Sequence, residues 1–527
     1  MRVSGLRKLA WSAPFFALAL ASLSCGNNGG GSSPPPVGTS TGTGYFFIAD
    51  APPVGTSVLK FEITLSNATL CSSVGAAGEC QGASQVSLID APLDLDLNNL
   101  QLGSAFVGSK TVPAGTYGGV RLTFSDYSLK LMLPDGTIKE FDNTTGVGSD
   151  TFLPLGATSV TPTFTSALTV SNNANFGFLL DFNANNSIQS TPTDVTGVLP
   201  AVSLVELPIT AGQGIIDLAA RKGRVSNLTR TCTSTESSGT FTLTDSLTGA
   251  ALAAISFDST TLIGEPTDAL EDKDITCDTF ANNQIVEVDI LARTNAQNSV
   301  EYFARQIQLV GAATGARLEG TVFQVNTASE FVLFVTGQEN LSTVPTGSFL
   351  TVSFDPLTAV FRMDAGDLPV VVTDFDTGDD LLAGQTIKLD LTAGSVVIAT
   401  TGCKTVADLC TAGADSLRLK QTTLSGRVAG TADPQFNIDT LPSILGSASL
   451  QRPLSADCQV CTVTSVDVVT SSATAFGSGL VNVSSLAVNN IVEVRGLLIK
   501  SGFAGPGPVS GFPPTLVATQ VRLQPSP

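Results

Sequence analysis

The sequence predicts an all-β protein, with an N-terminal β-sandwich followed by three small barrel-like β domains. Apolar and polar residues alternate in short runs, turns rich in Gly and Pro separate these runs, and long helical periodicity is missing. The chain of 527 residues is too long for one ordinary domain, and its hydrophobic fraction of 43% is enough to bury several cores. We therefore expect several β domains in series.

The composition excludes several classes of function. Charged residues make up only 13% of the chain and sum to −19, which argues against nucleic acid and against adhesion to anionic membranes through basic patches. Histidine is absent, which removes Ser-His-Asp and Cys-His catalysis and His-ligated zinc or haem. The only Trp is Trp11, in the expected signal peptide, so a sugar site built on aromatic platforms is disfavoured.

The N-terminus has the pattern of a secretory signal peptide. Three basic residues among the first eight precede an apolar run over residues 13–23, which is too short for a transmembrane helix. Ser22-Leu23-Ser24-Cys25 resembles the lipobox of bacterial lipoproteins, although Ser22 stands where that motif prefers Leu. We expect residues 1–24 to be a signal peptide and Cys25 to carry lipid. The alternative is an ordinary signal peptide with an incidental Cys.

The segment after the signal peptide cannot form a core. Residues 25–44 are rich in Gly, Ser, Pro and Thr and are typical of a flexible tether. No later segment offers about 18 consecutive apolar residues, so lipid on Cys25 would be the only membrane anchor. Gly26 occupies the position where an Asp favours inner-membrane retention of Gram-negative lipoproteins. This resemblance implies an exported protein at the outer membrane or cell surface.

Eight further cysteines form neighbouring pairs along the chain. An even number in an exported chain indicates disulfides, although the sequence alone leaves 105 pairings open. We favour pairing between neighbours, because each pair lies within one expected domain. Cys458-Gln-Val-Cys461 could instead be a redox pair, but β-branched residues follow it in place of the helix of that motif. The expected pairs are Cys71 with Cys80, Cys232 with Cys277, Cys403 with Cys410, and Cys458 with Cys461.

Residues 45–210 are expected to form the β-sandwich. Apolar residues alternate with polar ones over 59–65 and again over 120–124, so each run has one buried and one wet face. Pro134-Asp135-Gly136 separates two further runs and predicts a hairpin. Tyr117 follows a turn and enters a strand, where we expect a structural tyrosine corner; the alternative is a ligand contact.

A set of short motifs in this domain resembles an uncharacterised domain of bacterial lipoproteins, one of the numbered domains of unknown function. The resemblance covers about a third of the chain and implies no established activity. Asn183 stands where that pattern has an Asp. The motifs appear in the order Asp50-Ala51-Pro52, Val86-Ser87-Leu88, Leu93-Asp94-Leu95, Val112–Tyr117, Val120-Arg121-Leu122, Leu180-Asp181-Phe182 and Ser187-Ile188.

The remainder of the chain repeats itself three times, over residues 218–312, 317–422 and 423–525. Each unit opens with a strand Gly, and the three glycines are 97 and 106 residues apart, so each unit has the size of a domain. This pattern is similar to a second domain of unknown function, a barrel-like repeat of bacterial lipoproteins. The repeated strands begin with Lys222-Gly223, Glu319-Gly320 and Ser425-Gly426, continue with Ile285–Val288, Thr386–Leu389 and Ile491–Val494, and close with Ala304–Ile307, Leu419–Thr422 and Ala518–Val521.

No catalytic or metal-binding residue and no cofactor is predicted, with calcium as the one alternative. Ser57 and Lys60 match the spacing of penicillin-recognising enzymes, but a strand places them on opposite faces. Asp374–Asp380 and Asp181–Asn185 supply clustered oxygens of the kind that bind calcium; an acidic turn and a polar strand end are the simpler interpretations.

We therefore expect a non-catalytic, membrane-anchored envelope lipoprotein with a binding or scaffolding role. Its partner would be an envelope or extracellular protein or polysaccharide, and no nucleic acid. The alternatives are a surface polysaccharide-binding protein and an envelope hydrolase that uses paired carboxylates. The sequence selects neither contact residues nor a carboxylate pair.

Overall fold

The computed structural model describes most of residues 40–524. Strands dominate throughout, which confirms the all-β prediction. No helix in this part is long and apolar enough to cross a membrane. The residues between 40 and 524 that are not described are 52, 102, 144–150, 192, 208, 211–213, 234–235, 245–250, 265–274, 296–298, 310–315, 342, 366–367, 401, 448, 452–462, 473, 478–479 and 501–512.

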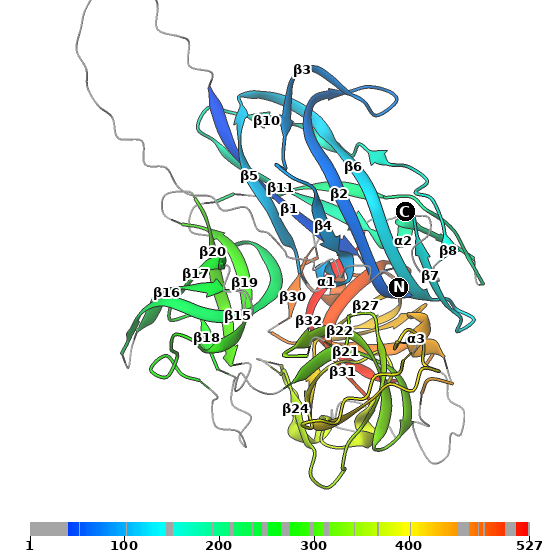
Figure 1. Ribbon diagram of the computed structural model, residues 1–527. Helices are drawn as coiled ribbons and strands as arrows, with labels where there is room; N and C mark the ends of the chain where they lie inside the picture. The colour runs from blue at the N-terminus through cyan, green and yellow to red at the C-terminus, as the bar shows by residue number, and fades with distance from the viewer. Residues whose placement is uncertain are drawn as a thin grey trace, which may run out of the picture.

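The N-terminal domain, here called the sandwich, contains two large sheets (Figure 1). The first has the order β14 (Val202–Leu207), β11 (Asn175–Asn183), β1 (Thr41–Ala51), β5 (Ala105–Pro113). The second is built on the long strands β2 (Ser57–Val74) and β6 (Gly115–Met132). It also contains β3 (Cys80–Ser87), β4 (Leu93–Asp96), β7 (Ile138–Asp142), β8 (Thr151–Phe152), β9 (Ser159–Val160) and β10 (Thr163–Val170). Smaller elements are α1 (Leu97–Leu100), α2 (Ala184–Ser187), β12 (Ile188–Ser190) and β13 (Val195–Val198).

The alternating pattern explains how these two sheets pack. Phe61 on β2 and Phe124 on β6 contact Phe182 of β11, with ring centroids 5.7 and 6.1 Å apart, so the inner faces of both sheets share one core. The predicted hairpin is present between β6 and β7, with Gly136 at φ +86°. One boundary needs correction: β1 begins at Thr41, so the tether predicted over 25–44 ends earlier, because Thr41 to Gly44 pair with β5.

Three domains with identical topology follow, here called barrels 1, 2 and 3. In each barrel, the first strand lies between the second and the fifth strand, and the fifth pairs with the sixth. Parallel pairing of the third strand with the sixth closes a ring of five strands. The short fourth strand also pairs with the sixth. Barrel 1 contains β15 (Gly214–Cys232), β16 (Ser237–Thr244), β17 (Ala251–Phe257), β18 (Leu262–Ile263), β19 (Ile285–Thr294) and β20 (Val300–Leu309), and so begins four residues before the expected start at 218.

Barrels 2 and 3 repeat this arrangement. Barrel 2 contains β21 (Arg317–Thr327), β22 (Glu330–Glu339), β23 (Phe349–Ser353), β24 (Val360–Met363), β25 (Thr386–Leu391), β26 (Thr411–Lys420) and the turns η1 (Val372–Asp374) and η2 (Gly378–Asp380). Barrel 3 contains β27 (Thr422–Ala432), β28 (Gln435–Asp439), α3 (Ser443–Gly446), β29 (Val466–Val469), β30 (Ala475–Phe476), η3 (Val483–Ser485), β31 (Ile491–Ile499) and β32 (Thr515–Leu523).

The strand glycines that open the three repeats share one physical reason. A Cβ atom on Gly223, Gly320 or Gly426 would lie 2.6, 2.1 or 3.0 Å from a carbonyl oxygen of the neighbouring second strand. The backbones of the first two strands therefore approach too closely for a side chain at this point in the barrel.

One repeat assignment was wrong. In barrels 1 and 3, Gln306 and Gln520 lie beside Asp289 and Arg495 of the preceding strand, just before a register irregularity. In barrel 2 this position belongs to Ser416, beside Asp390, and not to Gln421. Leu419-Lys420-Gln421-Thr422 resembles the closing strand in composition, but it comprises the end of β26, the connecting residue Gln421 and the start of β27.

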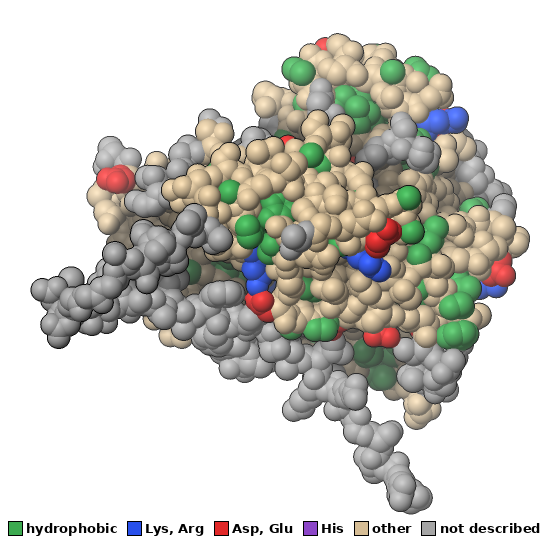
Figure 2. Space-filling view, turned by 90° about the horizontal axis from the view of Figure 1, so that it is seen from above, with side chains coloured by type: hydrophobic (Ala, Val, Ile, Leu, Met, Phe, Trp, Pro, Cys, Tyr) green, Lys and Arg blue, Asp and Glu red, His purple; other side chains and the backbone are tan. Residues whose placement is uncertain are grey.

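The four domains pack against one another. Tyr45 and Phe47 on the outer face of β1 contribute to the core cluster of barrel 1. A further apolar cluster joins Leu59 of the sandwich, Phe334 of barrel 2 and Ile444 of barrel 3. In Figure 1 barrel 1 (green) lies to the left below the sandwich, and barrels 2 and 3 lie together beneath it. The face in Figure 2 shows few Lys, Arg, Asp or Glu side chains, in keeping with the low charge content of the chain.

Candidate functional site

A cleft of about 470 Å³ lies where the three barrels meet, here called the three-barrel cleft. This volume is within the range of about 300–1,000 Å³ that is usual for small-molecule sites, which occur preferentially at domain interfaces. Barrel 1 supplies most of the lining, and barrels 2 and 3 close the remaining sides. The polar residues that line it are Asp217, Thr260, Asp289, Arg305, Gln306, Gln421, Arg495, Thr519 and Gln520.

Equivalent positions of barrels 1 and 3 both contribute to this cleft. Asp289 and Gln306 are neighbours on β19 and β20, and Arg495 and Gln520 are neighbours on β31 and β32 at the same place in the topology. Asp289 of barrel 1 and Arg495 of barrel 3 therefore occupy equivalent positions but carry opposite charges. Burial raises the pKa of Asp289, and the positive charge of Arg495 opposes that shift.

Other polar groups of the cleft have partners within the protein. Asp217 accepts a hydrogen bond from Arg305 at 2.6 Å, and this carboxylate raises the pKa of the guanidinium. Thr519 Oγ1 lies 3.0 Å from Oε1 of Gln421, and Oε1 of Gln520 accepts a hydrogen bond from Arg522 at 3.0 Å. The amide nitrogen of Gln306 is buried and has no hydrogen-bond partner among the described residues.

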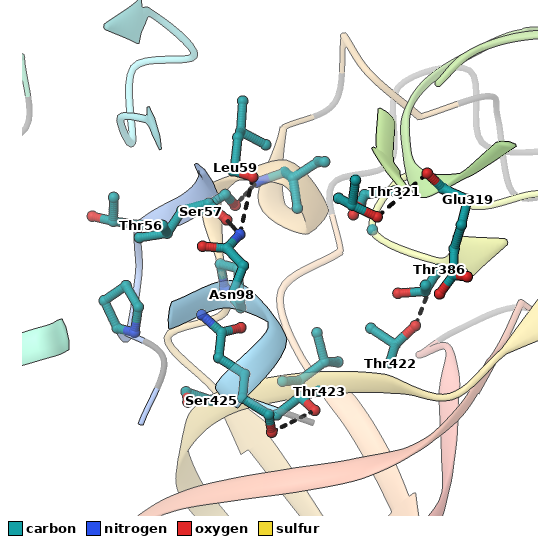
Figure 3. A pocket seen from close by; sticks show the side chains of 18 residues that line it. Thr56, Ser57, Leu59, Asn98, Glu319, Thr321, Thr386, Thr422, Thr423 and Ser425 are labelled. Atoms are coloured by element: carbon teal, nitrogen blue, oxygen red, sulfur yellow. Dashed lines mark hydrogen bonds between the residues drawn. The ribbon is translucent and has the colours of Figure 1, made fainter. Parts of the chain in front are cut away.

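A second, smaller cavity of about 130 Å³ lies between the sandwich, barrel 2 and barrel 3, here called the hydroxyl pocket (Figure 3). The side chain of Asn98 donates to the carbonyl of Leu59 at 2.9 Å, and the amide of Thr386 donates to Oγ1 of Thr422 at 2.9 Å. The polar groups therefore connect elements of the protein, and the remaining space suits a few water molecules. We interpret the hydroxyl pocket as a structural joint.

Ser57, one of the residues singled out from the sequence, lines the hydroxyl pocket. Its hydroxyl accepts a hydrogen bond from the backbone of Ile444 at 2.8 Å and lies 3.2 Å from Oγ of Ser443. Lys60, in contrast, pairs with Glu62 at 3.0 Å. Ser57 thus connects the sandwich to barrel 3, and its local contacts do not resemble a nucleophile activated by a lysine.

Three carboxylates gather between the sandwich and barrel 3, here called the acid cluster: Asp50, Asp181 and Glu493. Burial raises the pKa of Glu493 to about 7 and that of Asp181 to about 6, and the charge of Arg522 opposes both shifts. Burial also raises the pKa of Asp50 well above its usual range; a hydrogen bond from Gln101 opposes this, while the negative charges of the other two carboxylates add to it.

The oxygen-rich segments considered as an alternative calcium site make other contacts. The Asn183 side chain caps α2 by accepting from the amide of Asn186 at 2.9 Å, whereas Asp181 belongs to the acid cluster. Asp380 accepts from the backbone amide of Thr377 at 2.9 Å within its own turn. Within the described ranges, no group of three or more Asp, Glu or Cys side chains is arranged to hold a metal ion.

Three of the four expected cysteine pairs lie at distances compatible with disulfides. The Cα atoms are 5.2 Å apart for Cys71 and Cys80, 5.8 Å for Cys232 and Cys277, and 5.8 Å for Cys403 and Cys410. Cys25, Cys458 and Cys461 lie outside the described residues.

With the geometry of the sandwich established, its family can be stated. Residues 41–198 match the family model described as Domain of unknown function (DUF4382). The N-terminal segment is a DUF4382 domain. This confirms the resemblance seen in the sequence, and the DUF4382 segment contains two of the three carboxylates of the acid cluster, Asp50 and Asp181. No curated protein matches the chain. The resemblance of the three barrels to a second family stays a prediction.

The fifth strand of each barrel carries a sequence signal for the buried charges. Each barrel places charged residues between apolar ones on its fifth strand, and those at the first of these positions are Glu287, Lys388 and Glu493. A charge in the middle of such a stretch is costly unless it is paired. Some of the charged partners lie in another domain, as Lys388 and Lys420 do for Glu287, and no local pattern identifies these partners from the sequence.

Proposed function

We propose that this protein is a non-catalytic envelope lipoprotein, anchored through lipid on Cys25, which binds a ligand in the three-barrel cleft. The main support is that cleft: it has the volume of a ligand site, and all three barrels contribute to its lining. The N-terminal pattern up to Cys25 supports the anchor, and the absence of His in the chain supports a binding role over the common hydrolytic mechanisms.

The packing between domains supports a rigid arrangement of the cleft. Barrels 1 and 2 are joined by a charge network in which Glu287 of barrel 1 contacts Lys388 and Lys420 of barrel 2 at 3.7 and 3.1 Å. Barrels 2 and 3 share apolar clusters, in which Leu497 of barrel 3 packs with residues of barrel 2. Buried contacts of this kind hold the walls of the cleft in a fixed geometry before a ligand arrives, which lowers the entropic cost of binding.

The anchor is tested by shaving intact cells with protease, comparing the native protein with Cys25→Ser. Loss of the native protein from the cells, together with release of the variant into medium or periplasm, is the expected result and indicates surface exposure. Protection of the native protein combined with release of the variant would support the anchor but place the protein on the periplasmic side. A variant that stays with the membrane would contradict lipid anchoring through Cys25.

Binding in the cleft is tested with a photoreactive amino acid at position 520, inside the cleft. The matched control carries the same amino acid in place of Gln435, which is exposed on β28 of the same barrel and does not line the cleft. We expect a reproducible envelope adduct, identified by mass spectrometry, at position 520 and not at 435. Equal labelling at both positions, or no adduct at position 520, would contradict a binding role of the cleft.

A further inference from the structure

The formal charges that line the three-barrel cleft compensate one another. The lining contains two aspartates and two arginines, so it has no net charge. Asp217 and Arg305 form an ion pair at 2.6 Å, and the positive charge of Arg495 acts on Asp289. A charged ligand would have to compete with these internal interactions and would leave one of the lining charges uncompensated. The electrostatics of the cleft therefore favour an uncharged ligand.

The remaining polar groups are amides and hydroxyls. Gln306 belongs to barrel 1, Gln421 to the connection between barrels 2 and 3, and Gln520 to barrel 3; each planar amide carries donors beside an acceptor. The amide nitrogen of Gln306 has no partner among the residues described, and Thr519 adds a hydroxyl that both donates and accepts. Groups of this kind match neighbouring hydroxyls on a ligand, each of which also donates and accepts.

Apolar side chains occupy the space between these polar groups. Leu262, Leu291 and Ala475 line the cleft and are half-buried or exposed, so they offer contact area for C–H groups. Phe303 is not an exposed platform: it is almost fully buried, and the guanidinium of Arg293 lies 3.6 Å from the centre of its ring. Stacking on an aromatic ring is therefore not the basis of recognition here, and hydrogen bonds to the amides have to supply specificity.

We propose that the three-barrel cleft binds a neutral saccharide chain, whose hydroxyl groups pair with Asp289, Gln306 and Gln520 and whose C–H faces contact the apolar lining. This inference rests on the proposed binding function and names its ligand class. The net charge of −19 of the chain agrees with a neutral ligand, since it disfavours polyanions at long range.

The test is isothermal titration of the mature full-length chain carrying Cys25→Ser. The probes are the neutral hexasaccharides cellohexaose, maltohexaose and mannohexaose, with hexagalacturonic acid as the anionic probe. We expect saturable binding of at least one neutral probe, with an affinity that does not change when salt is raised, because no ion pair forms with the ligand.

Variants locate the binding to the cleft. Asp289→Asn combined with Gln306→Ala removes one acceptor charge and one amide whose nitrogen has no hydrogen-bond partner among the described residues. We expect this pair to weaken binding at least about tenfold, while Asp278→Asn, an exposed position on the same barrel outside the cleft, leaves it unchanged. Melting curves of all variants confirm that they are folded.

Each contrary outcome has a distinct meaning. Equal binding by the Asp289/Gln306 variant and the parent would overturn the assignment to this cleft. Binding of hexagalacturonic acid alone, weakened by salt, would overturn the neutral ligand class and leave the binding function intact. Release of reducing ends from a bound probe would support the saccharide class and overturn the non-catalytic half of the proposed function. An absence of heat with every probe overturns the saccharide inference, and the photocrosslinking experiment decides independently whether the binding function stands.

Discussion

Glu287 and Lys388 occupy the same position in two successive barrels, carry opposite charges, and lie 3.7 Å apart across the interface between those barrels. Their cross-strand neighbours, Lys222 and Glu319, show the same reversal and also form an ion pair. Barrels 1 and 2 therefore meet through equivalent faces whose charges are interchanged. Burial alone would raise the pKa of Glu287, but the ammonium groups of Lys222, Lys420 and Lys388 outweigh it and hold that pKa below its usual range.

Replacement of Glu287 is expected to destabilise the protein strongly. Glu287→Gln removes the anion that Lys222, Lys388 and Lys420 share. Each ammonium group keeps a further carboxylate partner, so we expect a cost of about 2–3 kcal/mol. Urea denaturation should show this as a lower midpoint, while Glu206→Gln, at an exposed site on β14, should leave the midpoint unchanged. Equal midpoints for the two variants would show that the charge network contributes little to stability.

The strand glycines should tolerate a methyl group to different extents. The distance from the added Cβ to the neighbouring carbonyl oxygen predicts that Gly320→Ala destabilises most, Gly223→Ala less and Gly426→Ala least, over a range of about 1–3 kcal/mol. Gly430→Ala is the control on β27, because the nearest atom would be 3.8 Å away. Thermal midpoints in any other order would mean that close approach of the backbones is not what requires these glycines.

Stability should fall as the pH rises from about 4.5 to about 7. The pKa of Glu493 is raised from 4.5 to about 7 in the folded protein, so the folded state holds its proton more tightly than the unfolded state across this window. Asp181, raised to about 6, acts in the same direction. The thermal midpoint should therefore be higher at pH 5 than at pH 8.

Glu493→Gln provides the control for this pH dependence. The variant cannot ionise at this position, so it should gain on the order of 3 kcal/mol over the parent at pH 8 and show a flatter profile. Glu236→Gln, at an exposed site in barrel 1, should reproduce the parent profile. A profile that keeps its slope in Glu493→Gln would place the titration elsewhere in the protein.

Tyr117 is expected to act through stability alone. Its ring is buried, and its hydroxyl donates to the carbonyl of Pro113 at 2.9 Å, as predicted for a tyrosine corner. Tyr117→Phe should therefore cost about 1 kcal/mol in denaturant unfolding and leave saccharide titrations unchanged. Loss of binding at unchanged stability would instead favour the ligand role.

The cross-linked loops predict a graded effect of removing cysteine pairs. The pair Cys232 and Cys277 closes a separation of 45 residues, and its replacement by alanines should cost about 4 kcal/mol. The pair Cys403 and Cys410 spans only 7 residues and should cost about 2 kcal/mol. Melting of both double variants tests this order, and identical midpoints for variant and parent would show that the sulfurs are not bonded in the parent.

Much of the fold could be predicted, because local patterns determine it. The alternation along β2 and β6, the hairpin at Gly136 and the three strand glycines are all properties of short segments. The misassigned closing strand of barrel 2 shows the limit of this approach. Leu419-Lys420-Gln421 resembles the corresponding segments in composition, and only the register of β25 with β26 identifies Ser416 as the equivalent of Gln306.

The cleft could not be predicted, because its residues come from three domains. Asp289 and Arg495 are separated by about two hundred residues, and neither has a local pattern that points to the other. The end of the tether was misjudged for a related reason. Gly42 and Gly44 have the composition of a linker, yet a Cβ on either would clash with Ala174 or Phe176, which come much later in the chain.

The hydrogen bonds of Ser57 to Ser443 and Ile444 have a consequence for biogenesis. These partners are 386 and 387 residues from Ser57 in sequence, so the chain has to be synthesised as far as Ile444 before this contact can form. Until then the sandwich exposes Leu59 and Met132, which are covered in the finished protein by barrels 2 and 3. For an exported lipoprotein, as proposed above, a chain that stalls before its last barrel would therefore present an uncovered apolar surface to envelope chaperones and proteases, and its survival would depend on how quickly that barrel arrives.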